Sequence, residues 1–253
     1  GFEVFLDAEH FYDGFKANSD YAMKVLESAK KAGVDMLVLC DTNGGTLTHE
    51  ISSITQTVCS SFTTPIGVHH HNDAGVAVAN GIAAIINGAI SVQGTINGYG
   101  ERCGNCDLTT LIPNIVLKLG YHCNAESALE HLTETSRYIS EIANLAHNEH
   151  APYVGDNAFA HKGGIHVSAL KHNTATYEHI NPELVGNRRK VIISELAGKS
   201  NIQVKAKELG ISLSKIQLSE TILRRIKILE DQGFQFEAAE GSFELLIRKS
   251  NGE

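Results

Sequence analysis

The chain has 253 residues, a formal net charge of −8 at pH 7, and 42% hydrophobic and 20% charged residues. Its lysines and arginines are scattered, so we expect no nucleic-acid partner. No apolar run approaches the roughly 18 residues of a membrane span, and the opening GFEVFLDAEH does not have the pattern of a signal peptide. Five cysteines do not make a disulfide framework in a chain of this size, and we therefore expect a cytoplasmic protein with no membrane partner.

One unit repeats through the first 120 residues: a short apolar run, a polar or glycine-containing turn, and an amphipathic stretch of helical length. A repeat of about 30 residues is typical of βα units in a parallel sheet. The predicted strands are Phe2–Leu6, Met36–Cys40, Ile66–His71 and Ser91–Ile96. The predicted helices are Asp20–Ala32, Thr48–Ser61, Gly75–Asn87 and Asp107–Leu119.

Polar side chains follow every predicted strand. They are Asp7 and Glu9; Asp41, Thr42 and Asn43; His71, Asn72 and Asp73; and Glu101, Arg102 and Asn105. Active sites of (β/α)₈ barrels lie at the carboxyl ends of the strands, so the pattern predicts an α/β fold that forms the C-terminal half of a TIM (β/α)₈ barrel. A doubly wound sheet is the alternative, although LDAEHFYDGF is not the glycine-rich phosphate loop that such sheets usually carry.

The pattern changes after Gly120. Ala125–Leu145 is predicted to be one long helix, and an irregular stretch rich in Gly, Asn and His precedes further helices from Leu196 to Lys249. So long an irregular stretch is usually functional. The predicted domains are a half-barrel at 1–120, a helical extension at 121–150, an irregular active-site subdomain at 151–200 and a helical subdomain at 201–253.

His69 and His71 lie two residues apart on a predicted strand and therefore face the same way, whereas His70 faces the opposite way. Two imidazoles on one face suit one divalent metal, and Asn105 from the next strand end adds an oxygen ligand. Such a mixed set of nitrogen and oxygen ligands suits Zn, Mn or Co; Mg would suit a set with fewer nitrogen ligands. The alternative is a buried histidine pair with no metal.

Other candidates keep two interpretations each. Glu9 is either an acid–base group at the barrel mouth or a solvated loop acid. The hydroxyl of Thr42 either holds a substrate carboxylate or caps the next helix. Glu101 and Arg102 are either catalytic or a structural ion pair.

Two further sets of residues could carry chemistry. Cys103 and Cys106 form a C-x-x-C pair, although the sequence around them is not thioredoxin-like. The irregular stretch contains a cluster of proton-transfer candidates, which are His161, His166, His172 and Tyr177.

Several stretches together resemble the metal-dependent acetyl-CoA-condensing enzymes, a family that includes isopropylmalate, homocitrate and citramalate synthases. HHHNDAGVAVAN is similar to the family's H-x-H-N-D-x-G-x-A-x-A-N, and GTINGYGERCGN to its G-x-G-E-R-x-G-N. FAHKGGIHVSAL and YEHINPELVG are similar to the segment after the family's barrel. VLCDTNGGTL, VQGTINGYGERCGN and FEAAEGSFELL are most similar to the citramalate synthase branch.

The resemblance implies a role for seven residues. The metal ligands would be His69, His71 and Asn105, and the catalytic and substrate-binding residues Glu9, His166, Tyr177 and Thr42. It implies a homodimer in which acetyl-CoA condenses with a 2-oxo acid, most simply pyruvate to give citramalate, in isoleucine and leucine biosynthesis. A divalent metal (Mn, Mg, Zn or Co) would polarise the keto group.

Three alternatives stay open beside this function. They are a 2-isopropylmalate or homocitrate synthase, a metal-dependent lyase or aldolase on the same barrel, and a non-catalytic fragment that binds metal or a partner. The family's opening motif D-x-T-L-R-D-G, which supplies an aspartate ligand and an arginine, is not in this sequence. We therefore expect an internal fragment without the first barrel half, inactive on its own.

Overall fold

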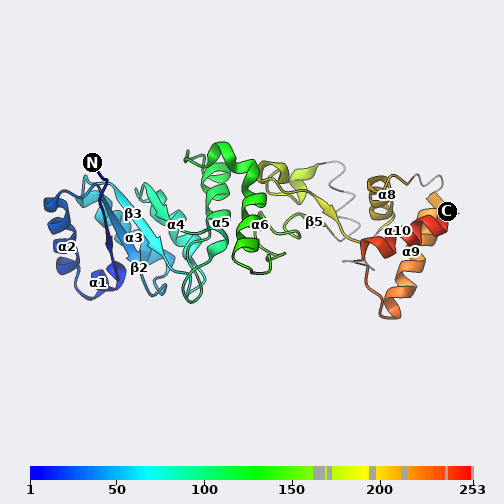
Figure 1. Cartoon of the computed structure of the whole chain (residues 1–253), viewed down its shortest axis with the longest axis horizontal. Helices are drawn as coiled ribbons and strands as arrows, with labels where there is room; N and C mark the ends of the chain where they lie inside the picture. The colour runs from blue at the N-terminus through cyan, green and yellow to red at the C-terminus, as the bar shows by residue number, and fades with distance from the viewer. Residues whose placement is uncertain (162–168, 170–172, 194–197, 212–215, 237–238, 252–253) are drawn as a thin grey trace. The chain divides into compact units, whose positions relative to one another are not determined.

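A computed structural model describes residues 1–161, 169, 173–193, 198–211, 216–236 and 239–251. The chain divides into two compact units, Gly1–His147 and Asn148–Glu253, each of which is described by itself (Figure 1). Among the described residues, no helix is both long and apolar enough to cross a lipid bilayer.

The first unit is built on a parallel sheet of four strands in sequential order. The strands are β1 (Phe5–Ala8), β2 (Met36–Asp41), β3 (Ile66–His70) and β4 (Ser91–Gln93). Each strand is joined to the next through helix, so that every carboxyl end lies at the same edge of the sheet. The sequential order is that of a (β/α) barrel rather than of a doubly wound sheet, whose strand order reverses.

The sheet is curled toward its inner face. The Gln93 side-chain nitrogen on β4 donates to a carboxylate oxygen of Asp7 on β1 at 3.2 Å, although two strands lie between them. In a flat sheet, three strand spacings of about 4.8 Å would hold the two backbones about 14 Å apart, with both side chains pointing straight out of the sheet. The contact therefore requires barrel-like curvature, with both side chains on the concave face.

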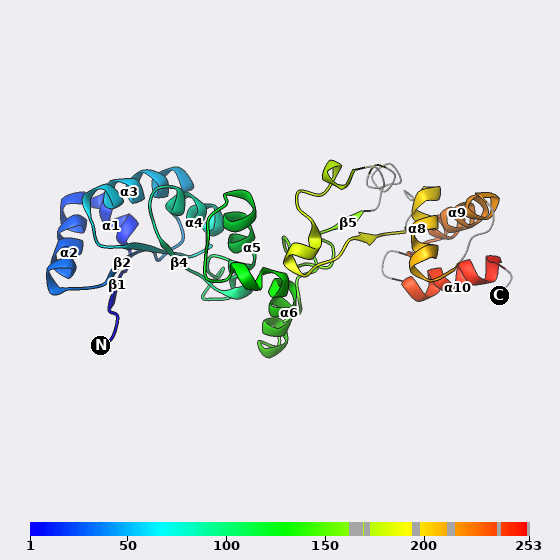
Figure 2. The same ribbon diagram turned by 90° about the horizontal axis from the view of Figure 1, so that it is seen from above.

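Helices cover the other face of this sheet (Figure 2). They are α1 (Phe11–Ala17), α2 (Ser19–Ala32), α3 (Thr48–Ser61), α4 (Ala77–Ile86) and α5 (Leu108–Pro113). The side chains of Leu37, Leu39 and Val68 pack with Leu26 and Ile51 in a core that joins strands to helices. Apolar burial of this kind is worth roughly 1.5–3 kcal/mol for each large side chain, and it holds the strand ends in place.

Several predicted boundaries are corrected by the structure. The first strand runs from Phe5 to Ala8 rather than Phe2–Leu6, and α1 was not predicted because Phe11–Ala17 is too short to show a helical period. The predicted helix Asp107–Leu119 changes at Pro113 into a π-helical turn, since proline cannot donate the amide hydrogen bond that an α-helix needs.

The predicted single helix Ala125–Leu145 is also wrong in part. A 3₁₀ helix spans Glu126–His131, and the α-helix α6 runs only from Leu132 to Ile142. Leu129 and Leu132, both buried, are three residues apart. That spacing fits a 3₁₀ turn as well as an α-helical turn, so the apolar periodicity did not distinguish the two.

The second unit begins with irregular chain. Two short strands, β5 (Ala160–His161) and β6 (Lys190–Val191), pair in parallel, and the α-helices described after β6 pack together. These helices are α8 (Lys199–Glu208), α9 (Ile216–Asp231) and α10 (Glu240–Asn251). Ile202, Ile222, Ile226, Phe243 and Ile247 form their shared core.

Candidate functional site

Two imidazoles meet at the carboxyl end of β3. The Nε2 atoms of His69 and His71 lie 3.4 Å apart, on the concave face of the sheet. His70 faces the helices instead, as strand alternation predicts. It is fully buried against the Tyr12 ring, 5.6 Å between centroids, and burial, followed by the charge of His69, lowers its pKa to about 3. Of the three histidines, only His69 and His71 are thus paired on the inner face.

Asn105 joins this pair through a backbone bridge to His71. Its carbonyl oxygen Oδ1 is buried and has no hydrogen-bond partner among the described residues, and the same holds for Nδ1 of His71. Buried polar atoms are normally satisfied, so the unpartnered Asn105 oxygen beside the two Nε2 atoms favours a ligand at this position. Nδ1 of His71 is not the nitrogen that faces His69, and it carries no such indication. Metal bonds of about 2.0–2.2 Å to nitrogen or oxygen place neighbouring ligand atoms roughly 3–3.5 Å apart, and the two Nε2 atoms fit one shared divalent ion.

The donor set is neutral. Within the described part of the chain, no group of three or more His, Cys, Asp or Glu side chains is arranged to hold a metal. An ion at this position would therefore depend on the Asn105 amide as well as on the two imidazoles. Imidazole nitrogen with amide oxygen suits a borderline metal such as Zn, Mn or Co better than Ca.

Two glycines of GYGERCGN make room for Asn105. A Cβ atom on Gly100 would lie 2.0 Å from the Asn105 side-chain nitrogen. Gly104 has a left-handed φ of 87°, and a Cβ there would lie 1.9 Å from the carbonyl oxygen of Gly98. The glycines in this turn therefore allow the backbone to fold tightly enough to place the Asn105 amide beside His71.

Glu9 and Thr42 are brought together across two strand ends. The Thr42 hydroxyl donates to Oε2 of Glu9 at 2.7 Å, and its oxygen accepts from the backbone amide of His10, also at 2.7 Å. Thr42 does not cap α3, because Leu47 holds the cap position. Its hydroxyl proton is committed to Glu9, so a substrate carboxylate that bound Thr42 would have to replace Glu9 as the acceptor.

Arg102 braces three strand-end loops. Its guanidinium forms two hydrogen bonds to Asp73, at 2.8 and 3.1 Å, one to the Thr42 carbonyl at 2.7 Å and one to Glu101 at 3.2 Å. The hydrogen bond from Arg102 lowers the pKa of the Asp73 carboxyl. These contacts favour the structural interpretation of Glu101 and Arg102, with Arg102 tying the loops after β2 and β3 to its own loop.

Two family models match the chain. The model described as HMGL-like matches residues 9–139, just over half of the 253 residues. The chain belongs to the HMGL-like family. A second model, described as homocitrate synthase post-HMGL domain-like, matches residues 153–234. The HMGL-like match thus covers β2, β3 and β4 with the strand-end residues from Glu9 onward, and the second match covers most of the second unit.

Curated relatives carry one recurring name. An (R)-citramalate synthase from Synechocystis sp. is 56% identical over 100% of this chain and 48% of its own length. Another from Geobacter sulfurreducens is 51% identical over 99% of this chain and 48% of its own length. The chain thus spans about half the length of these relatives. A solved HMG-CoA lyase from Bacillus subtilis has a TM-score of 0.45 and 21% identity, covering 50% of this chain and 44% of that one.

The post-HMGL unit contains the remaining predicted residues. Tyr177 is 42% exposed on a 3₁₀ turn, whereas His166 and His172 lie outside the described residues. His161 is buried, and its Nε2 lies 3.3 Å from Oε1 of Glu178. The strand-end residues belong to the first unit, whereas Tyr177, His161 and Glu178 belong to the second.

Glu178 was missed by sequence reasoning. It is buried, and Arg189 donates to both of its carboxylate oxygens while His161 contacts one of them. Burial alone would raise the pKa of Glu178, but the hydrogen bonds and charge of Arg189, together with His161, outweigh burial and lower that pKa. The only available signal was its place in YEHINPELVG, next to Tyr177.

The cysteine pair does not look like a redox centre. Cys103 is exposed and Cys106 is fully buried, and all five cysteines are free thiols. Burial, followed by the charge of Asp107, raises the pKa of Cys106 to about 12. A reactive cysteine needs an accessible thiolate, which Cys106 does not provide.

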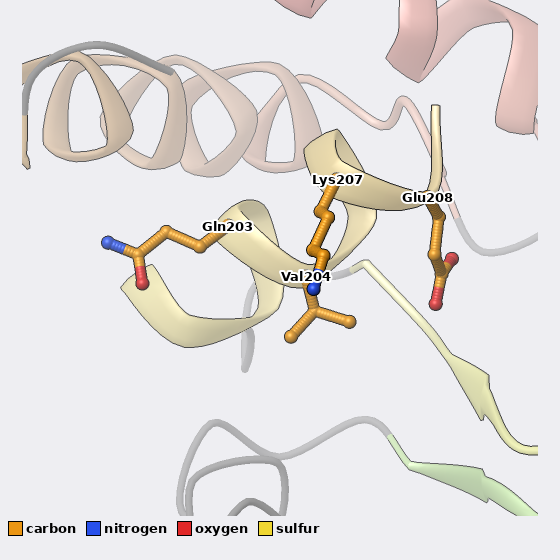
Figure 3. Close-up of a pocket in the computed structure, with 4 residues that line it drawn as sticks. All are labelled: Gln203, Val204, Lys207 and Glu208. Atoms are coloured by element: carbon orange, nitrogen blue, oxygen red, sulfur yellow. The ribbon is translucent and has the colours of Figure 1, made fainter. Parts of the chain in front are cut away.

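Two hollows lie away from the strand-end residues. One is an apolar groove at the amino end of β4, whose lining includes Ile86, Ile90 and Leu111. The other lies along α8, and its described lining consists of Gln203, Val204, Lys207 and Glu208 (Figure 3). Since these four side chains come from one helix, they do not converge on a common point. The described lining of neither hollow includes the convergent polar groups that mark the carboxyl end of the sheet.

Proposed function

We propose that the protein of which this chain is part condenses acetyl-CoA with a 2-oxo acid, with pyruvate as the preferred acid and citramalate as the product. The observation that carries the proposal is the pair of Nε2 atoms of His69 and His71, 3.4 Å apart beside the unpartnered carbonyl oxygen of Asn105. The names of the curated relatives support the choice of acids. This reaction would serve isoleucine and leucine biosynthesis in the cytoplasm.

A divalent metal, Mn, Zn, Co or Mg, would be held by His69, His71 and Asn105. When bound, it supplies a Lewis acid for the keto group of the 2-oxo acid. The three side chains fix its position at the mouth of the curled sheet. Because they are neutral, we infer that a carboxylate from another part of the whole protein completes the set.

Thr42 and Glu9 would act on the substrates. The 2-oxo acid carboxylate takes the Thr42 hydroxyl proton in place of Glu9, whose hydrogen bond at 2.7 Å is then released. By family resemblance we assign His166 to removal of a proton from the acetyl methyl group, with Glu9 tuning it and Tyr177 assisting. The resulting carbon nucleophile attacks the keto carbon, and water then releases CoA.

The test is turnover of the full-length gene product. Purified enzyme would be supplied with acetyl-CoA and, in turn, pyruvate, 2-oxoisovalerate and 2-oxoglutarate, and free CoA would be measured with a thiol reagent. We expect the highest kcat/KM with pyruvate. A higher value with either of the other acids would instead identify a 2-isopropylmalate or homocitrate synthase, because one methylene is worth only about 1–3 kcal/mol in such discrimination.

A metal-dependent lyase or aldolase on the same barrel is the second candidate, because residues 9–139 match the HMGL-like model without specifying the reaction. The match of residues 153–234 to a homocitrate synthase post-HMGL model favours condensation. Release of acetyl-CoA or pyruvate from a hydroxy acid, with no CoA released in the condensation assay, would favour the lyase. Metal binding with neither reaction would favour a non-catalytic protein.

The whole protein would act as a homodimer with a site shared between subunits. Mixing a His166→Ala variant with a Glu9→Ala variant, after demonstrated subunit exchange, should restore part of the activity. Complete failure of the mixture would contradict a shared site. We expect no CoA release by a polypeptide of residues 1–253 alone, because the opening motif with its aspartate ligand and arginine is not in this sequence. Turnover within about tenfold of the full-length enzyme would contradict this expectation.

A further inference from the structure

Three polar side chains on the inner face of the sheet are joined in a row by hydrogen bonds. Nδ1 of His69 lies 2.9 Å from Oε1 of Gln93, and Nε2 of Gln93 lies 3.2 Å from Oδ1 of Asp7. This row of side chains crosses the concave face from Asp7 on β1 to Gln93 on β4 and then to His69 on β3. It ends at the histidine whose other nitrogen, Nε2, faces His71.

The chemistry of Asp7 decides the orientation of the other two groups. A carboxylate can only accept hydrogen bonds, so the Gln93 amide must turn its NH₂ toward Asp7. Its carbonyl oxygen then faces His69. Because that oxygen only accepts, Nδ1 of His69 must carry the proton, which leaves Nε2 without one and with its lone pair directed at His71.

The geometry points to Gln93 as a positioning residue that fixes the tautomer of His69 for metal binding, under the control of Asp7. This inference rests on the proposed function, because it assigns His69 as a metal ligand. A histidine that binds metal through one nitrogen commonly donates from the other to an oxygen that orients the ring. Gln93 supplies that oxygen, and it needs Asp7 because an amide, unlike a carboxylate, can present either end.

The experiment measures Co²⁺ affinity of the metal-free full-length protein by titration, following the visible absorption of the bound ion. Gln93→Leu, similar in size but without polar atoms, should weaken binding by about 10–100-fold. The control is Ser91→Ala on the same strand and face, which should leave the dissociation constant unchanged. In the double variant Asp7→Asn, Gln93→Glu, the carboxylate at position 93 accepts the hydrogen bond from His69, and the amide at position 7 donates to that carboxylate. This swap should therefore bind Co²⁺ with wild-type affinity or better.

The outcomes separate the two proposals. If the wild-type protein binds no Co²⁺, the metal site itself is wrong, and the inference with it. If the wild type binds and Gln93→Leu binds equally well, the positioning role is wrong while the site stands. If Gln93→Leu is weak and the swap is equally weak, the residue matters only for packing, which also overturns the role. If Gln93→Leu fails to fold, weak Co²⁺ binding by a folded swap variant still overturns the role.

Discussion

Two groups of buried polar side chains in this protein differ in one respect. In the first unit, Oδ1 of Asn105 and Nδ1 of His71 have no partner among the described residues. In the second unit, Glu178 is satisfied by a bidentate Arg189 and by His161. A buried polar atom without a partner costs free energy unless a ligand supplies one, whereas a satisfied network supports the backbone around it. We therefore propose that a ligand completes the first group, because the unpartnered Asn105 oxygen lies beside the paired Nε2 atoms of His69 and His71, and that the second group supports the backbone around it.

The largest effect is expected at Gly100. Gly100→Ala places a methyl group 2.0 Å from the Asn105 side-chain nitrogen, which must move away from the two histidines. A displacement of about 1 Å at a reacting centre costs about 100-fold in rate, so kcat/KM of the full-length enzyme should fall by that amount and metal affinity should fall with it.

The matched control is Gly14→Ala in α1, because no atom lies within 4 Å of the added methyl group. It should leave both quantities unchanged. Equal behaviour of the two variants would show that Asn105 is not part of the site.

The second effect is on stability. Arg189→Met leaves the buried Glu178 carboxylate without its main partner. Because Arg189 itself is partly exposed, we expect the cost of the unsatisfied carboxylate to be about 1–3 kcal/mol. Urea unfolding of the full-length protein should show this loss in the transition of the second unit. Metal affinity should be unchanged, and Arg188→Met, an exposed neighbour, should have little effect. A loss of metal with no loss of stability would reverse the assignment of the two groups.

The smallest effect is a pH dependence. The pKa of Glu178 is lower in the folded protein than its ordinary value of about 4.3, so its ionised form stabilises the fold. That contribution is complete above the ordinary pKa and is lost as the pH falls through the lowered one. The difference in unfolding free energy between wild type and Glu178→Gln should therefore be constant from pH 7 to about 5 and shrink below about pH 4. A difference independent of pH would contradict the ion pair.

Strand periodicity made much of the first unit predictable. Apolar runs every thirty or so residues locate parallel strands, and alternation places His69 and His71 on one face and His70 on the other. Because parallel strand ends share an edge, Glu9 and Thr42 were expected to lie near this pair. The sequence did not show that the Thr42 hydroxyl donates to Glu9, since that contact depends on side-chain rotation across two loops.

Long-range pairs outside regular structure were not predictable. Gln93 and Asp7 meet only because the sheet curls, and a single sequence shows neither curvature nor register between edge strands. Glu178 and Arg189 lie in irregular chain, where no period indicates which residues are buried. The roles of Tyr177 and of His166, which lies outside the described residues, depend on family resemblance.

The most direct test of the central claim is metal content. Full-length protein would be purified as wild type, His69→Ala, His71→Ala and His70→Leu, and bound metal per subunit would be measured by mass spectrometry. Leucine suits position 70 because that side chain is fully buried and its ring nitrogens have no partner among the described residues. The account predicts that His69→Ala and His71→Ala lose the metal and that His70→Leu retains it. Loss of the metal from a folded His70→Leu protein, or its retention in both alanine variants, would contradict the site.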